Sequence, residues 1–143
     1  MEPITSLCEN ISTARFLIVD DNMVNRSLLN YLLEPYGECV WAADGLEAID
    51  RYKTASIDDQ PFSVVFMDVM MPDFNGFDAL EEIRLYEGQK ELKPSDVVMV
   101  SALKGQEQID RSVALGAKDY LLKPVRQDDI FGLLENLGIS RLK

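Results

Sequence analysis

The chain has 143 residues, which is enough for one domain with a hydrophobic core and too few for two. Its formal net charge of −11 argues against a surface for nucleic acid or an acidic membrane, because both require basic patches. No apolar run approaches the ~20 residues of a membrane span, and residues 1–14 lack the basic start and apolar middle of a secretory signal. Cys8 and Cys39 are typical of reduced thiols in a cytoplasmic protein.

The sequence contains no histidine. Its absence excludes Ser-His-Asp and Cys-His triads, histidine-based zinc sites and phosphorylation of the chain on a histidine of its own. Two separated cysteines also cannot form a structural zinc site. The side chains left for chemistry are carboxylates, hydroxyls and lysines.

Short apolar segments alternate with segments of helical periodicity. The expected strands are residues 15–19, 39–42, 62–67, 96–100 and 118–122. Each is followed by apolar residues at helical spacing, which we expect to face the sheet. In chain order these residues are Val24, Leu28 and Leu32 with Leu29 and Leu33; Leu46, Ile49 and Tyr52; Phe77, Leu80, Ile83 and Leu85; Ile109, Val113 and Ala114; and Ile130, Leu133, Leu134 and Leu137.

This alternation predicts an α/β fold: a doubly wound, flavodoxin-like (βα)5 parallel sheet with helices on both faces and strand order 2-1-3-4-5. We expect a single domain over residues 15–139, with tails at 1–14 and 140–143. Residues 54–60 are polar and predict a loop. Residues 87–95 include Gly88 and Pro94 and predict a long, mobile connection.

Polar side chains follow four of the five strands. Asp20 and Asp21 end the first strand, Asp68 the third, Ser101 the fourth and Lys123 the fifth. In open α/β sheets, ligands bind outside the carboxyl ends of the strands. Because the first and third strands are neighbours in the predicted order, we expect the three carboxylates to share a pocket.

Three carboxylates in one pocket raise each other's pKa, and a hard divalent cation relieves this repulsion. Oxygen ligands with a few waters suit Mg²⁺, with Mn²⁺ as a substitute. Asp21 and Asp68 are the expected direct ligands, and Asp20 acts through a water. A backbone carbonyl just after Asp68 completes the set, and Lys123 adds positive charge opposite the cluster.

A metal, a lysine and a hydroxyl are what a phosphoryl group requires around its oxygens. Asp68 is then the expected nucleophile, because carboxylates form aspartyl-phosphates. Each residue also has a structural interpretation: Asp20, Asp21 and Ser101 as helix caps, and Lys123 as part of a solvated turn. Four strand ends with complementary groups favour the site over separate caps.

The chain resembles the receiver domains of two-component response regulators over about residues 15–137. The motifs that carry the resemblance are Val19-Asp20-Asp21-Asn22, Met67-Asp68-Val69-Met70-Met71-Pro72 with Gly76, Val100-Ser101-Ala102 and Gly116-Ala117-Lys118-Asp119-Tyr120-Leu121-Leu122-Lys123-Pro124. The resemblance implies a signalling protein, not an enzyme. It implies that Asp68 accepts phosphate from a phosphohistidine on a histidine kinase or histidine phosphotransfer protein.

In this resemblance Asp20 and Asp21 correspond to the metal-binding acidic pair, and Met70 offers its backbone carbonyl. Lys123 corresponds to the lysine that binds a phosphoryl oxygen, and the resemblance implies a cis peptide bond between Lys123 and Pro124. Ser101 is the switch hydroxyl, and Tyr120 is the aromatic switch that turns inward when Ser101 moves onto the phosphoryl group. The fourth helix, fifth strand and fifth helix would then form a two-state surface that docks a phosphorylation-dependent downstream protein.

Met70 and Leu103 lie two residues after Asp68 and Ser101, beside the expected approach of a hydrolytic water. Neither side chain can hydrogen-bond that water, which predicts slow self-dephosphorylation.

Other functions remain to be weighed. A stand-alone receiver is favoured by the start at Met1, by the tail, and by the end just after the last helix; an excised receiver of a hybrid kinase or larger regulator is the alternative. A haloacid-dehalogenase-like phosphatase is a distant alternative, because the run 20–22 lacks the Asp-x-Asp spacing and no cap domain fits. A flavodoxin-like redox role fails, because acids replace the phosphate cradle after the first strand.

Overall fold

The computed structural model describes residues 14–71 and 74–142. Its ten elements are β1 (Ala14–Val19), α2 (Met23–Leu33), β2 (Gly37–Ala42), α3 (Gly45–Ile57), β3 (Val64–Asp68), α4 (Gly76–Gln89), β4 (Asp96–Ser101), α5 (Gln106–Ala114), β5 (Asp119–Leu122) and α6 (Gln127–Asn136). The strands form one parallel sheet in the order β2-β1-β3-β4-β5, which confirms the predicted topology. No helix among these residues is long and apolar enough to cross a membrane.

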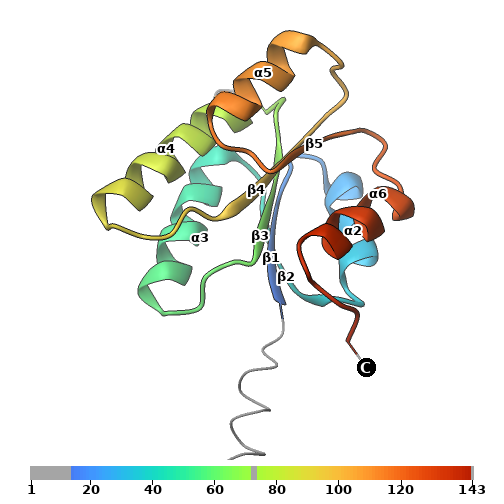
Figure 1. The fold of residues 1–143 in the computed structure, drawn as a ribbon, viewed down its shortest axis with the longest axis horizontal. Helices are drawn as coiled ribbons and strands as arrows, with labels where there is room; N and C mark the ends of the chain where they lie inside the picture. The colour runs from blue at the N-terminus through green and yellow to red at the C-terminus, as the bar shows by residue number, and fades with distance from the viewer. Residues whose placement is uncertain (1–13, 72–73, 143) are drawn as a thin grey trace, which may run out of the picture.

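The helices cover both faces of the sheet. Figure 1 shows α3, α4 and α5 on one side and α2 and α6 on the other. The central strands are buried on both faces, as unbroken apolar runs predict, and every residue of β3 is buried. Two hydrophobic clusters result, one under α3 and α4 and the other under α2 and α6. This packing fixes the carboxyl edge of the sheet as a rigid platform.

The predicted core face of α2 is partly wrong. Leu29 and Leu33 are buried in the cluster shared with α6, whereas Val24 is 73% exposed and Leu28 is also exposed. The helix carries two apolar stripes at four-residue spacing, and periodicity alone cannot tell which one faces the sheet. The stripe of Val24, Leu28 and Tyr31 therefore forms an apolar outer face.

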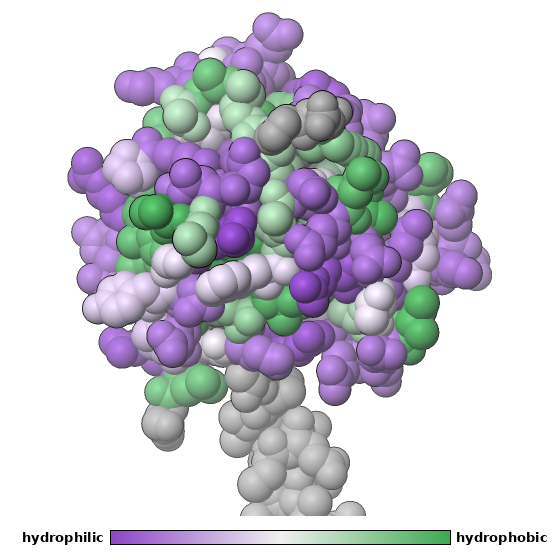
Figure 2. Space-filling model, turned by 180° about the vertical axis from the view of Figure 1, so that it is seen from behind, coloured by the Kyte–Doolittle hydropathy of each residue, from purple (hydrophilic) through white to green (hydrophobic). Residues whose placement is uncertain are grey.

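Five other residues predicted to face the core lie on the surface. These are Leu46 in α3, Leu85 in α4, and Ile109, Val113 and Ala114 in α5. In α3 the predicted Tyr52 is buried, but the residues buried beside it are small alanines, Ala48 and Ala55, which carry little apolar signal in the sequence. Figure 2 shows the molecule from behind, where apolar side chains lie exposed among polar ones.

Both predicted loops are shorter than expected. Helix α3 continues to Ile57, and α4 continues through Gly88 to Gln89, so only residues 90–95 connect α4 to β4. The expected mobile connection is wrong at its start, because Glu87 is buried inside the fold. The polar residues at these positions belong to the exposed sides of helices, a composition that is equally typical of a loop.

Glu87 is a buried carboxylate with four donors around it. Its Oε2 accepts from the Tyr52 hydroxyl and from the Ser95 backbone N–H (2.8 Å) and hydroxyl (2.9 Å), and its Oε1 pairs with Arg84 at 2.9 Å. Burial on its own would raise the pKa of Glu87, but these hydrogen bonds outweigh burial and hold the pKa below its ordinary value of 4.5. The network ties α3, α4 and the start of β4 together.

We predict that Glu87→Gln destabilises the fold in a pH-dependent way. Because the pKa of Glu87 is lower in the folded state, its contribution is fully present above about pH 4.5 and is lost as pH falls through the lowered pKa. Denaturant unfolding should show a loss of about 3 kcal/mol at pH 7, shrinking below pH 4.5. A difference that is equal at pH 7 and pH 4 would contradict this.

Candidate functional site: an acidic pocket at the carboxyl edge

Asp20, Asp21 and Asp68 meet at the carboxyl edge, as predicted. Asp20 follows β1 and Asp68 ends β3, and the parallel register that pairs Val19 with Met67 brings these two strand ends side by side. One carboxylate oxygen of each of the three residues lies within 4.8 Å of those of the others. Asp20 and Asp68 are buried, whereas Asp21 is exposed at the mouth of the pocket.

Lys123 reaches into this pocket from the end of β5. Its Nζ lies 2.9 Å from Asp20 Oδ2 and 3.2 Å from Asp68 Oδ1. Its backbone N–H donates to the Ser101 carbonyl at 2.8 Å, and the Lys123–Pro124 peptide bond is cis, as expected. The lysine is thus in direct contact with two of the acids rather than only opposite the cluster.

The pocket shifts the pKa of both Asp68 and Lys123. Burial, followed by the charge of Asp20, raises the pKa of Asp68 to about 6, although Lys123 opposes the shift. Burial disfavours the charged form of Lys123, but its bonds to the two acids outweigh this and raise its pKa. Repulsion between the acids is therefore only partly relieved, and oxygen donors at this spacing suit a hard divalent cation.

Backbone groups hold the two buried acids in place. The Asn22 N–H donates to Asp20 Oδ1 at 2.9 Å, and the Met70 N–H donates to Asp68 Oδ1 at 3.2 Å. Asn22 also caps α2 through its side chain, so the cap and the acid share one turn. Met70 exposes most of its side chain beside Asp68.

The two expected switch residues meet at Leu103. Ser101 is fully buried at the end of β4, and its Oγ accepts from the Leu103 N–H at 3.0 Å. The Tyr120 hydroxyl donates to the Leu103 carbonyl at 2.8 Å. The Leu103 side chain is exposed. Ser101 and Tyr120 therefore both hold the backbone of the loop between β4 and α5.

The sequence prediction missed Arg26 of α2. Its guanidinium donates to the Asp20 carbonyl at 2.8 Å and lies 5.6 Å from the centre of the Trp41 ring. It therefore places a positive charge next to the backbone of the acidic pair. The only signal was a lone basic residue in an otherwise uncharged helical segment, which more often lies in solvent.

These observations define a class of protein. It is a doubly wound α/β domain whose carboxyl edge carries a lysine and an acidic pocket of the kind that binds cations. The response regulator receiver domain family matches residues 16–135. The chemotaxis protein CheY of Treponema pallidum is 34% identical over 113 residues, 78% of this chain and 73% of CheY. The sensor histidine kinase GacS of Pseudomonas protegens is 35% identical over 114 residues, 79% of this chain and 12% of GacS.

A solved structure of a related protein has the same fold. CheY in the CheX–CheY–BeF3–Mg complex from Borrelia burgdorferi has a TM-score of 0.76 and 25% identity, covering 89% of this chain and 90% of that one. The chain belongs to the response regulator receiver domain family. It is a receiver domain of two-component signalling, similar both to a short chemotaxis protein and to a segment of a long kinase. A stand-alone receiver and a receiver from a larger protein are both compatible with these similarities.

Gly76 lies directly against the backbone of Asp68. Its N–H donates to the Val69 carbonyl at 3.0 Å, and a Cβ at this position would overlap the Asp68 carbonyl oxygen. We predict that Gly76→Ala lowers the free energy of unfolding by about 2 kcal/mol, because the loop or α4 must shift. Denaturant titration measures this loss.

Gly132→Ala in α6 is the matched control. A Cβ there meets nothing within 4 Å, so the variant should be more stable by about 0.5 kcal/mol through helix propensity. Equal effects of the two substitutions would contradict the assigned role of Gly76.

Proposed function

We propose that the protein is a cytoplasmic phosphoacceptor in which Asp68 takes a phosphoryl group from a phosphohistidine of a histidine kinase or histidine phosphotransfer protein. The observation that carries this proposal is the contact of one lysine with two buried acids, with a third acid at the mouth of the pocket. Self-phosphorylation and self-dephosphorylation serve a signal, so the protein is not an enzyme acting on external substrates.

The hydrogen bonds indicate which oxygen of Asp68 reacts. Oδ1 is bonded by Lys123 and by the Met70 N–H, which leaves Oδ2 as the attacking oxygen. Oδ2 forms a bond to phosphorus as the P–N bond of the phosphohistidine breaks, and the imidazole leaves with the electron pair of that bond. Lys123 then bonds a phosphoryl oxygen, and Ser101 donates its hydroxyl proton to another.

Asp20, Asp21 and Asp68, with the backbone carbonyl of Met70, would hold Mg²⁺. Their carboxylate oxygens have the spacing and the hard character that this ion prefers. Bound Mg²⁺ supplies positive charge for the phosphoryl oxygens. The relative from Borrelia burgdorferi that was solved with BeF3 and Mg supports this assignment.

The direct test is labelling with a small acyl phosphate, such as acetyl phosphate, and Mg²⁺. We expect one phosphoryl group per chain, located on Asp68 by peptide mass spectrometry, and none in Asp68→Asn. Labelling at another residue, or sustained turnover of the acyl phosphate without labelled protein, would contradict the proposal.

The outer face of α2 is the proposed docking site for the phosphodonor. Val24 and Tyr31 are each 73% exposed, and α2 begins two residues after Asp21. The helix has no acidic residue although the chain has a net charge of −11. An apolar helix of the donor packed on this face would bring its phosphohistidine to the pocket.

We predict that Val24→Ala combined with Tyr31→Ala slows phosphotransfer from the protein donor by about tenfold, because two apolar contacts are lost. Labelling by acetyl phosphate should stay within about twofold of wild type, since the pocket is untouched. Radiolabel transfer measures the first rate.

Leu85→Ala is the control, because Leu85 is also an exposed apolar residue but belongs to α4. The docking assignment fails if Leu85→Ala slows transfer as much as the double variant. It also fails if the double variant slows labelling by acetyl phosphate as much as it slows transfer from the protein donor.

We predict a long-lived aspartyl-phosphate. Met70 and Leu103 are exposed beside the pocket and offer no side-chain hydrogen bond to an attacking water. Met70→Asn and Leu103→Glu should each shorten the lifetime of the phosphorylated protein, by about tenfold. Decay of radiolabelled protein measures this, and equal lifetimes in wild type and both variants would refute it.

A further inference from the structure

Arg26 is a basic residue beside an acidic pocket, yet it pairs with none of the acids. No ion pair of Arg26 is found among residues 14–71 and 74–142. Its guanidinium donates instead to the backbone carbonyl of Asp20 at 2.8 Å. The cation that contacts the carboxylates of Asp20 and Asp68 is Lys123. Arg26 therefore holds the backbone of the pocket, whereas Lys123 holds its charges.

The bonded carbonyl belongs to the peptide unit that joins Asp20 to Asp21. Because a peptide unit is planar, a fixed carbonyl also fixes the direction in which the chain enters Asp21. The other side of Asp20 is held as well, since its N–H donates to the Ala42 carbonyl at 3.1 Å. Asp21 is exposed, and no bond to its side chain is found in the part of the chain that the structure describes. The place of the Asp21 carboxylate at the pocket mouth therefore depends on this peptide unit.

Trp41 of β2 holds Arg26 in turn. The guanidinium lies 5.6 Å from the centre of the Trp41 ring, a distance at which a cation is attracted to the face of an aromatic ring. The ring is fixed by its Nε1, which donates to Asn30 Oδ1 at 3.3 Å. The Arg26 Nε is buried, and no hydrogen bond to it is found among the described residues. With its hydrogen bond to Asp20 alone, the guanidinium depends on the ring for its orientation.

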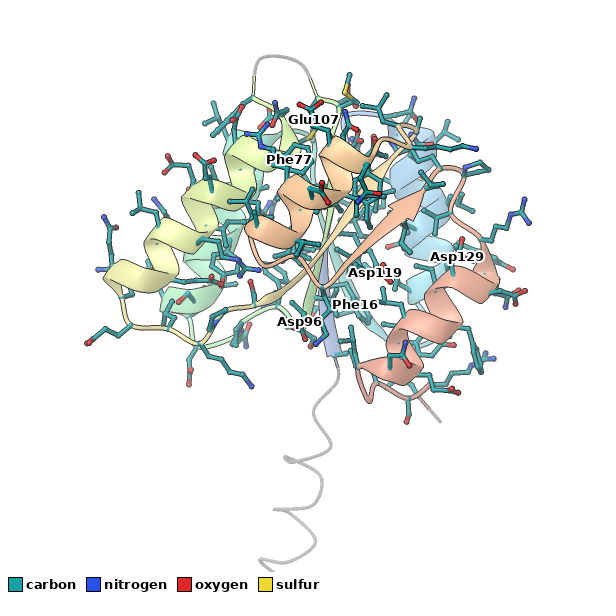
Figure 3. All side chains as sticks on the ribbon, turned by 45° about the horizontal axis from the view of Figure 1, so that its top comes forward. Phe16, Phe77, Asp96, Glu107, Asp119 and Asp129 are labelled. Carbon is teal, nitrogen blue, oxygen red and sulfur yellow. The ribbon has the colours of Figure 1, made fainter. Side chains whose placement is uncertain are left out.

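Both Arg26 and Trp41 come from elements that are fixed in the fold. Helix α2 packs Leu29 and Leu33 into the cluster that it shares with α6. Figure 3 shows α2, in light blue, on the same side of the sheet as α6, which carries the labelled Asp129. Strand β2 pairs with β1 over its whole length. The guanidinium is therefore held by two rigid elements.

We propose that Arg26 is a positioning residue for the metal-binding acids: it holds the peptide unit between Asp20 and Asp21, and Trp41 holds Arg26. This inference rests on the proposed Mg²⁺ site and names a residue that sets its affinity. Ordering a loose acid when the ion binds costs conformational entropy, and a peptide unit that is already held avoids part of this cost. Arg26 thus keeps the Asp21 carboxylate within reach of those of Asp20 and Asp68.

The charge of Arg26 and its positioning role predict opposite effects on Mg²⁺ binding. A guanidinium near the pocket repels a divalent cation, so if only its charge mattered, removing it would tighten Mg²⁺ binding. If Arg26 holds the acids in place, removing it weakens Mg²⁺ binding. The sign of the change therefore distinguishes the two roles.

The first test is a calorimetric titration of Arg26→Met with Mg²⁺. We expect the dissociation constant to rise about fivefold, because the peptide unit before Asp21 is released. Arg51→Met is the matched control, since it removes the same charge from a half-exposed arginine of α3 that pairs only with Glu47 among the described residues. It should stay within about twofold of wild type. Unchanged or tighter binding by Arg26→Met would overturn the proposal.

The second test separates positioning from a loss of stability. In labelling by acetyl phosphate, the Mg²⁺ concentration for half-maximal rate should rise about fivefold in Arg26→Met, and the rate at saturating Mg²⁺ should change far less. A variant that is only less stable loses folded protein at every Mg²⁺ concentration and keeps its half-saturation point. A loss of rate with that point unchanged would therefore refute positioning.

Two conservative variants test the contact with Trp41. Arg26→Lys keeps the charge but lacks the planar group that lies against the ring, so its Mg²⁺ affinity should fall between those of wild type and Arg26→Met. Trp41→Phe keeps an aromatic face and should bind within about twofold of wild type, whereas Trp41→Leu should bind about threefold more weakly. Wild-type affinity in both Arg26→Lys and Trp41→Leu would overturn the proposal even if Arg26→Met does not fold.

The wild-type titration separates this proposal from the proposed function. A wild-type chain that binds no Mg²⁺ contradicts the metal site and the role of Arg26 with it. A wild-type chain that binds Mg²⁺, with equal affinity in the Arg26 variants, contradicts the role of Arg26 alone.

Discussion

The carboxylates of Asp20 and Asp68 are buried side by side, and Lys123 is the cation that makes this arrangement tolerable. Two buried like charges would otherwise destabilise the fold or take up a proton. One lysine cannot neutralise three acids, so the pocket keeps an affinity for further positive charge. This remaining imbalance is the physical basis of the proposed metal site and of its chemistry with phosphoryl groups.

The parallel sheet makes this arrangement possible. Its register brings the ends of β1 and β3 together, and β5 delivers Lys123 from the far edge of the sheet across the end of β4. The hydrophobic clusters on both faces hold these strand ends still. The opposite end of the domain is fixed by the Arg84–Glu87 network.

The strands, their order and the residues of the pocket could be predicted from sequence, because each acid or lysine directly follows an apolar run. The exposed side of α2 could not, because Val24 and Leu28 repeat at the same spacing as the buried Leu29 and Leu33. The role of Glu87 was hidden for a different reason. A charged residue beside Gly88 is typical of a loop, and only the tertiary partners Tyr52, Arg84 and Ser95 make its burial favourable. Arg26 was missed in the same way, since its target is the Asp20 backbone carbonyl, which has no sequence signature.

A calorimetric titration with Mg²⁺ tests the central claim about the pocket most directly. Wild type should bind one ion per chain, and Asp21→Asn should weaken that binding by about tenfold or more, because a carboxylate at the mouth of the pocket is lost. Asp50→Asn, which changes an exposed acid on α3, should stay within about twofold of wild type. Absence of saturable binding, or equal weakening by both substitutions, would contradict a metal site formed by Asp20, Asp21 and Asp68.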